Sequence, residues 1–158
     1  MTVNRDITVN GGILVAHDGS DSADAALQTA LHLAGAFGNK VAVVRAWSLA
    51  SAPTPPTQEV GYVPPLDDFE AATLAALESD VAAVRAQYPD VTLTCSVVNG
   101  NAAEKLIEAS EHADLLVVGS RGRGGFAGLL LGSTSDQVVH HAKCRVLVDR
   151  GGRRSSAD

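Results

Sequence analysis

Short apolar runs alternate along the chain with segments whose apolar residues recur at helical spacing. Five runs rich in Val, Leu and Ile have the length and continuity of strands buried on both faces. They are predicted at residues 12–17, 41–47, 91–97, 115–119 and 145–149. The segments between them predict four helices, which begin among the capping residues 18–24, near Asp67, after Asn101 and near Ser133.

Five strands that alternate with four helices predict an α/β fold: one doubly wound, five-stranded parallel sheet with helices on both faces, Rossmann-like in architecture. Right-handed crossovers place the strand-to-helix loops at one edge of such a sheet. Ligands bind at that edge, where the order of the strands reverses. If the first and fourth strands are neighbours, the loops that follow them form one crevice.

The loop after the fourth strand is rich in glycine. Gly119 and Gly122 are followed, after nine residues, by Gly132, Ser133 and Thr134, where the last helix is predicted to begin. Glycines let a ligand touch the main chain without a Cβ in the way. The first N–H groups of a helix lack partners within the helix and lie at its positive end. This loop therefore predicts a site for a phosphate group.

The common phosphate-binding motifs do not fit. A P-loop requires a Gly-Lys dipeptide, and the sequence contains none. A dinucleotide fingerprint can be aligned with residues 122–127, but this run follows the fourth strand, and the glycines beyond it disfavour a helix there.

Composition and net charge limit the functions expected of the chain. The chain has 158 residues, a formal net charge of −6 and 46% hydrophobic residues, of which few are aromatic. The acidic balance argues against non-specific binding of nucleic acid. The length predicts one domain over residues 1–150, followed by a disordered tail at 151–158. Arg121 and Arg123 are interpreted as solvated charges.

The polar N-terminal residues and the absence of a long apolar run predict a cytoplasmic protein without a signal peptide or membrane span. Cys95 and Cys144 are too few for a disulfide framework and are expected to be reduced and buried. Residues 48–66 hold all but one of the prolines, which predicts a loop or a lid. The five histidines show no metal-binding spacing.

Three segments resemble the universal stress protein family. They are Ile13-Leu-Val-Ala-His-Asp-Gly-Ser20, the run from Ala113 to Phe126, and Leu131-Gly-Ser-Thr134. The resemblance covers residues 10–150, and the spacing Gly-x2-Gly-x9-Gly-[Ser/Thr] is that of the ATP-binding branch. It implies a strand order of 3-2-1-4-5, in which the first and fourth strands are neighbours.

The resemblance also implies roles for individual residues. Asp18 would meet the nucleoside, and Ala46 would offer backbone groups to adenine. Gly119 and Gly122 would leave room for ribose and phosphate.

The outer phosphates would then be held by the N–H groups and hydroxyls of Gly132, Ser133 and Thr134. For Ser133, an N-cap role competes with phosphate binding for the same N–H groups. A divalent ion, Mg²⁺ or Mn²⁺, would bridge the phosphates, since the site lacks an evident lysine.

The sequence departs from the family at two places that matter here. His17 stands where the family usually has a smaller or aliphatic residue, so its ring would crowd adenine, stack on it or point away. Arg145 replaces a proline common before the last strand. The proline-rich segment 51–65 is variable in the family, so nothing transfers onto it.

The favoured function is that of an ATP-binding, nucleotide-dependent stress sensor or interaction module. No base or arginine finger is evident, so at most slow ATP hydrolysis is expected. The apolar edge Val146-Leu-Val148 and the family resemblance predict a homodimer through the last strand. Two alternatives remain open: a nucleotide-free interaction protein of the same fold, and a nucleotide-consuming transferase or hydrolase.

Overall fold

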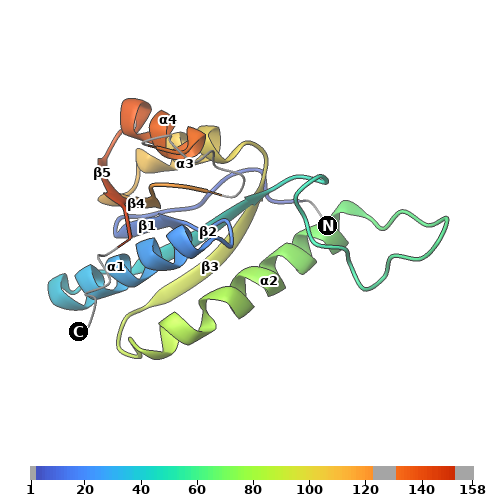
Figure 1. Ribbon diagram of the computed structural model, residues 1–158, viewed down its shortest axis with the longest axis horizontal. Helices are drawn as coiled ribbons and strands as arrows, with labels where there is room; N and C mark the ends of the chain where they lie inside the picture. The colour runs from blue at the N-terminus through green and yellow to red at the C-terminus, as the bar shows by residue number, and fades with distance from the viewer. Residues whose placement is uncertain (1–2, 123–130, 152–158) are drawn as a thin grey trace, which may run out of the picture.

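The computed structural model describes residues 3–122 and 131–151, which form a five-stranded sheet flanked by four helices (Figure 1). The strands are β1 (Ile13–Ala16), β2 (Val41–Trp47), β3 (Leu93–Asn99), β4 (Leu115–Gly119) and β5 (Arg145–Asp149). The helices are α1 (Asp21–Phe37), α2 (Leu66–Ala86), α3 (Ala102–Ser110) and α4 (Ser133–His141).

The strand order is β3-β2-β1-β4-β5, and all four pairings are parallel. The predicted fold class is therefore confirmed, including the strand order that makes β1 and β4 neighbours. β1 pairs with β2 on one side and with β4 on the other, with Ile13 opposite both Val41 and Leu115. The loops after β1 and β4 consequently leave the same edge of the sheet side by side.

Each face of the sheet buries its own core. Successive residues of a strand point to opposite faces, so Val15 packs with α1 and α2, whereas Leu14 packs with the core formed with α3 and α4. Figure 1 shows α1 and α2 on one side of the sheet and α3 and α4 on the other. With only three Phe and one Trp in the chain, Val, Leu and Ala fill most of both cores.

Strand boundaries match the sequence prediction at β2, β4 and β5; β1 is shorter than the predicted 12–17 by one residue at each end, and β3 differs most. The predicted run 91–97 begins two residues too early, because a turn after α2 bonds the Val91 N–H to the Tyr88 carbonyl. Pairing with β2 carries the strand onward to Asn99, which lies opposite Trp47. The pairing register, which alternation along one strand does not encode, thus shifts the element.

The proline-rich segment between β2 and α2 forms an irregular arm that projects from the body of the fold (Figure 1). Val60 and Val63 are among its most exposed residues, while Pro55 is buried. The Thr57 hydroxyl donates to Asp68 over 2.7 Å, which ties the arm to the start of α2. The prediction of a loop is confirmed. No residue of 48–65 lines the cavity described below, so the arm does not act as a lid in this conformation.

Both cysteines are free, as expected, but each is only partly buried rather than fully buried. Burial is the main cause that raises the pKa of the Cys95 and Cys144 thiols. None of the helices in the described ranges is long and apolar enough to cross a membrane. Residues 152–158 of the expected tail lie outside the described residues.

Candidate functional site

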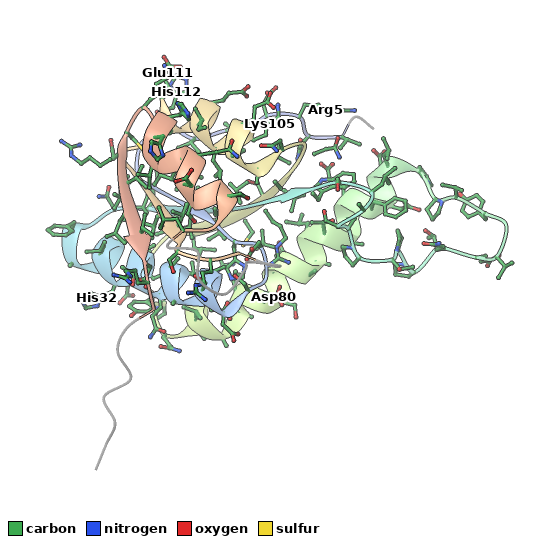
Figure 2. The ribbon with its side chains drawn as sticks, turned by 45° about the horizontal axis from the view of Figure 1, so that its top comes forward. Arg5, His32, Asp80, Lys105, Glu111 and His112 are labelled. Carbon is green, nitrogen blue, oxygen red and sulfur yellow. The ribbon has the colours of Figure 1, made fainter. Side chains whose placement is uncertain are left out.

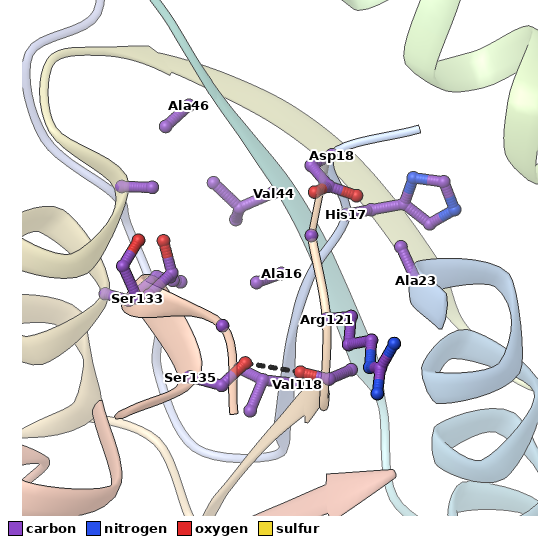
Figure 3. A pocket seen from close by; sticks show the side chains of 16 residues that line it. Ala16, His17, Asp18, Ala23, Val44, Ala46, Val118, Arg121, Ser133 and Ser135 are labelled. Carbon is purple, nitrogen blue, oxygen red and sulfur yellow. Dashed lines mark hydrogen bonds between the residues drawn. The ribbon is translucent and has the colours of Figure 1, made fainter. Parts of the chain in front are cut away.

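A cavity of about 320 Å³ opens at the carboxyl ends of the central strands. Its apolar part is formed by the ends of β1, β2 and β4 and the start of α3, and includes Ala16, Val44, Leu106 and Val118. Its polar rim comes from the loops after β1 and β4 and from the start of α4. Figure 3 shows Ser133 and Asp18 on opposite sides of the cavity, with Ala16 between them.

All seven residues that the sequence analysis assigned to a site line this one cavity. They are Asp18, Ala46, Gly119, Gly122, Gly132, Ser133 and Thr134. Their positions come from three strand ends and one helix start, so the strand order brings them together. Their contact with a ligand stays a prediction. Arg123 and the loop residues 124–130 lie outside the described residues.

The loop after β1 is held by its own side chains. Ser20 is the N-cap of α1, and its hydroxyl oxygen accepts from the Ala23 N–H at 3.2 Å. The Asp18 carboxylate accepts from the Ser20 N–H at 3.0 Å. Such bonds satisfy donors that the start of a helix leaves open. Asp18 is thereby fixed at the rim of the cavity.

The sequence left the direction of the His17 ring open, and the structure shows it. The residue is only 2% exposed, and its imidazole turns away from the cavity floor towards α1 (Figure 3). Its Nε2 lies 2.8 Å from Asp24 Oδ1, and its Nδ1 accepts from the Gly19 N–H at 3.2 Å. The ring therefore stabilises the turn that precedes α1 instead of crowding a ligand.

Arg45 of β2 completes this hydrogen-bond network around His17. Arg45 was not identified from the sequence. Its Nη2 lies 2.9 Å from His17 Nδ1 and 2.8 Å from Asp80 Oδ2, and its Nε donates to the His17 carbonyl at 2.8 Å. Since Nδ1 meets only donors, the ring proton belongs on Nε2, facing Asp24. An arginine within the apolar run 41–47 was the available signal, because a charge in a central strand needs partners.

The two glycines after β4 are required for different reasons. A Cβ on Gly119 would lie 2.3 Å from Ser22 Oγ and 2.8 Å from the Ser22 carbonyl oxygen, so this glycine lets α1 approach β4. A Cβ on Gly122 would lie 2.7 Å from Asp18 Oδ2, at the rim of the cavity. The space that the sequence analysis expected for a ligand beside Gly119 is thus occupied by α1, whereas the space beside Gly122 adjoins the cavity.

The start of α4 is not capped by the Ser133 side chain, which was the alternative to phosphate binding. The N-cap is Gly132, which has no side chain to bond, and Ser133 is the first helical residue. Within the described part of the chain, the N–H groups of Ser133, Thr134 and Ser135 have no acceptor. The Ser135 hydroxyl donates to the Gly119 carbonyl, which holds α4 against β4. The capping role weighed as the alternative for Ser133 is therefore not observed, because Gly132 has the extended N-cap conformation. Phosphate contact, the favoured role, stays a prediction.

No group of three or more His, Cys, Asp or Glu side chains in residues 3–122 and 131–151 is placed to hold a metal ion. The apolar lining residues Val44, Ala102, Leu106 and Val118 were also missed as site residues. Their sequence signal is that of a core, and only the topology shows that they end at an open edge.

Comparison with known proteins places this chain in a family. The profile of the universal stress protein family matches residues 11–150. The chain belongs to the universal stress protein family. Universal stress protein Rv2005c of Mycobacterium tuberculosis is 39% identical over 141 residues, which cover 87% of this chain and 45% of the relative. Rv2623 of the same species is 34% identical over 140 residues, with 87% and 44% covered. This universal stress protein chain thus spans about half the length of these relatives.

Solved structures show the same fold. Universal stress protein UspA from Lactobacillus plantarum has a TM-score of 0.65 and 24% identity, covering 92% of this chain and all of its own. A universal stress protein in complex with cAMP has a TM-score of 0.65 and 26% identity, covering 90% and 98%. One from Archaeoglobus fulgidus in complex with dAMP has a TM-score of 0.59 and 22% identity, covering 89% and 98%.

Proposed function

We propose that this universal stress protein binds an adenine nucleotide in the cavity between β1 and β4. The phosphates would lie at the start of α4, and the base over the apolar floor. One observation carries the proposal: α4 begins at Ser133, after the N-cap Gly132 and without a side-chain cap, at the polar rim of an otherwise apolar cavity. Open N–H groups at the positive end of a helix attract an anion.

The lining suits the two parts of such a ligand. Ala16, Val44 and Val118 present small or flat apolar surface, which favours burial of a base. The hydroxyls of Ser133 and Thr134 are placed on the rim beside the open N–H groups. Ala46 has no polar side chain, so it would contact the base through its backbone.

Relatives support the class of ligand. Structures of this fold have been described with cAMP and with dAMP. ATP is our specific proposal, with Mg²⁺ or Mn²⁺ held through its phosphates, because no metal-binding cluster is present in the described ranges. In this proposal the protein changes its interactions with the bound nucleotide, and any ATP hydrolysis is slow.

The last strand supports a second part of the proposal. β5 pairs only with β4, so its other side is an edge of the sheet, and it carries the apolar run Val146–Val148. Exposed edges pair with other strands. We propose a cytoplasmic homodimer joined through β5. A nucleotide-free dimer of the same fold is the alternative.

Calorimetry of the full chain with ATP and AMP, each with and without Mg²⁺, tests the nucleotide proposal. Gly122→Val places a side chain at the rim, against Asp18, and Gly122 does not have a positive φ that would forbid it. We expect this variant to bind ATP about tenfold more weakly or worse. Gly35→Val adds the same side chain on the exposed face of α1 and is expected to bind as the wild type does.

Failure of the wild type to bind either nucleotide would overturn the proposal and favour the nucleotide-free alternative. Equal weakening in Gly122→Val and Gly35→Val would also contradict this site. Acid extraction of the purified wild type, followed by chromatography, identifies any nucleotide that copurifies. Light scattering across a range of protein concentrations tests the dimer.

A further inference from the structure

A second cavity, of about 410 Å³, lies on the other side of the β4 end, between the first turn of α1 and the ends of β4 and β5. Its polar lining residues are Asp21, Ser22, Ser120, Arg121, Arg150 and Gly151. Arg121 borders both cavities. In Figure 3 its side chain lies beside α1, away from Ser133.

The sheet brings the two arginines to this cavity. Gly119 of β4 and Asp149 of β5 are paired in register, and the Ser120 N–H donates to the Asp149 carbonyl at 2.8 Å. Arg121 and Arg150 each follow directly after these joined ends. The Arg121 N–H also donates to Ser22 Oγ at 3.3 Å, which ties the same turn to α1.

The nearest strand carboxylate is engaged elsewhere. Asp149 accepts from the Thr29 hydroxyl through one oxygen and from the Gly151 N–H, at 2.7 Å, through the other. It therefore shapes the turn that carries Arg150. In the described ranges neither Arg121 nor Arg150 forms an ion pair.

The start of α1 adds further donors. The N–H groups of Asp21 and Ser22 have no acceptor in the part of the chain that the structure describes. The Ser22 hydroxyl accepts from Arg121, which leaves its own proton for another partner. The Asp21 carboxylate is the single acidic side chain in the lining, so two guanidinium groups outweigh it.

From this convergence we propose that the second cavity binds a small oxyanion of the phosphate class, held between Arg121 and Arg150. Guanidinium groups present paired N–H donors that match the oxygens of phosphate. Both arginines are exposed, which agrees with the interpretation of Arg121 as a solvated charge, but the sequence did not predict that Arg150, which follows β5, borders the same cavity. This inference does not depend on nucleotide binding in the first cavity.

Calorimetric titration with inorganic phosphate tests the proposal, in the full chain and in the Gly122→Val background that obstructs the first cavity. We expect Arg150→Gln to weaken phosphate binding about tenfold in both backgrounds. Arg5→Gln is the matched control, because Arg5 is exposed, forms no ion pair within the described ranges and lines neither cavity (Figure 2). Asp21→Asn removes the one opposing charge and is expected to tighten binding.

No phosphate binding by the wild type would overturn the proposal. Equal weakening by Arg150→Gln and Arg5→Gln would overturn it as well, because it would show general attraction to a charged surface. Titrations with ATP and AMP identify the source of the anion. Weaker binding of ATP alone in Arg150→Gln supports a nucleotide phosphate that reaches this cavity, and an effect on inorganic phosphate alone supports a free ion.

Discussion

The starts of α1 and α4 follow neighbouring strands at the same edge of the sheet, yet they are built differently. Before α1, three side chains accept from successive turns of the backbone: His17 from Gly19, Asp18 from Ser20, and Ser20 from Ala23. Before α4, the N-cap is a glycine, and no side chain takes that place.

This difference separates a helix start that its own side chains hold from one that no side chain caps. At a capped start, side-chain acceptors bond to the N–H groups of the adjoining backbone and hold the loop in one conformation. An uncapped start leaves N–H groups for a ligand, and the neighbouring glycines keep the approach open. The start of α1 is thus held by three side chains and leaves the Asp21 and Ser22 N–H groups open, whereas the start of α4 has no side-chain cap and supplies the open N–H groups of our nucleotide proposal.

The largest expected loss of stability comes from removing the His17 ring, which holds the turn between β1 and α1. His17→Ala removes a buried ring that bonds Asp24, Gly19 and Arg45. We expect the free energy of unfolding to fall by about 2–4 kcal/mol, from the lost packing and from donors left without acceptors. Urea denaturation measures the change. His32→Ala, at an exposed position of α1, is the control and is expected to stay within about 0.5 kcal/mol of the wild type (Figure 2). A similar loss in both variants would show that the network contributes little.

The next largest expected loss of stability comes from the contact between α1 and the end of β4. Gly119→Ala would place a Cβ against the Ser22 backbone, so α1 would have to shift from β4. We expect a loss of about 1–3 kcal/mol in unfolding free energy. Gly35→Ala, within α1 itself, would place a Cβ at an ordinary contact distance of 3.8 Å from Val91 and is expected to be neutral or to stabilise by up to about 1 kcal/mol. An unchanged stability of Gly119→Ala would contradict this account of the glycine.

Ser20→Ala removes only the cap of α1. The Ala23 N–H would lose its acceptor, with an expected cost of about 1 kcal/mol in unfolding free energy. Nucleotide affinity is expected to stay unchanged, because Ser20 does not line the first cavity. Parallel urea and calorimetric titrations measure both quantities. A large loss of affinity without a loss of stability would reverse the assignment of the two helix starts.

Ser133→Ala is the counterpart at α4, with the smallest expected change in stability. Its hydroxyl caps nothing, so the unfolding free energy should stay within about 0.5 kcal/mol of the wild type. If its hydroxyl contacts a phosphate, the affinity for ATP should fall several-fold, by about 1 kcal/mol for one lost hydrogen bond. Unchanged affinity would remove Ser133 from the proposed site and leave only the N–H groups.

Much of this architecture could be predicted from the sequence, because short apolar runs mark the strands, including the edge strand β5, which is only partly buried rather than buried on both faces as expected. The continuous apolar runs at 41–47, 115–119 and 145–149 become β2, β4 and β5 with the predicted bounds. The order of the strands came from the family resemblance and is confirmed. Alternation alone misplaced β3 by two residues, since its position depends on pairing with β2.

The details of the site depend on contacts between distant residues, which local pattern does not contain. Ser133 has a better capping side chain than Gly132, yet the backbone enters α4 one residue earlier. The direction of the His17 ring depends on Arg45, which is 28 residues away in the sequence. The placement of Arg121 and Arg150 on one cavity depends on the register of β4 and β5.

The strand order also has a consequence for how the protein forms during synthesis. The Gly12 N–H donates to Asp114, 102 residues later in the chain. At translation rates of about 5–20 residues per second, β1 emerges from the ribosome roughly 5–20 s before the strand that completes its pairing. The loop that carries Asp18 therefore exists first in a nascent chain in which β1 can pair with β2 but its other side has no partner. The cavity becomes complete only after α4 has been synthesised, so the proposed nucleotide would bind and stabilise the fold only at the last stage.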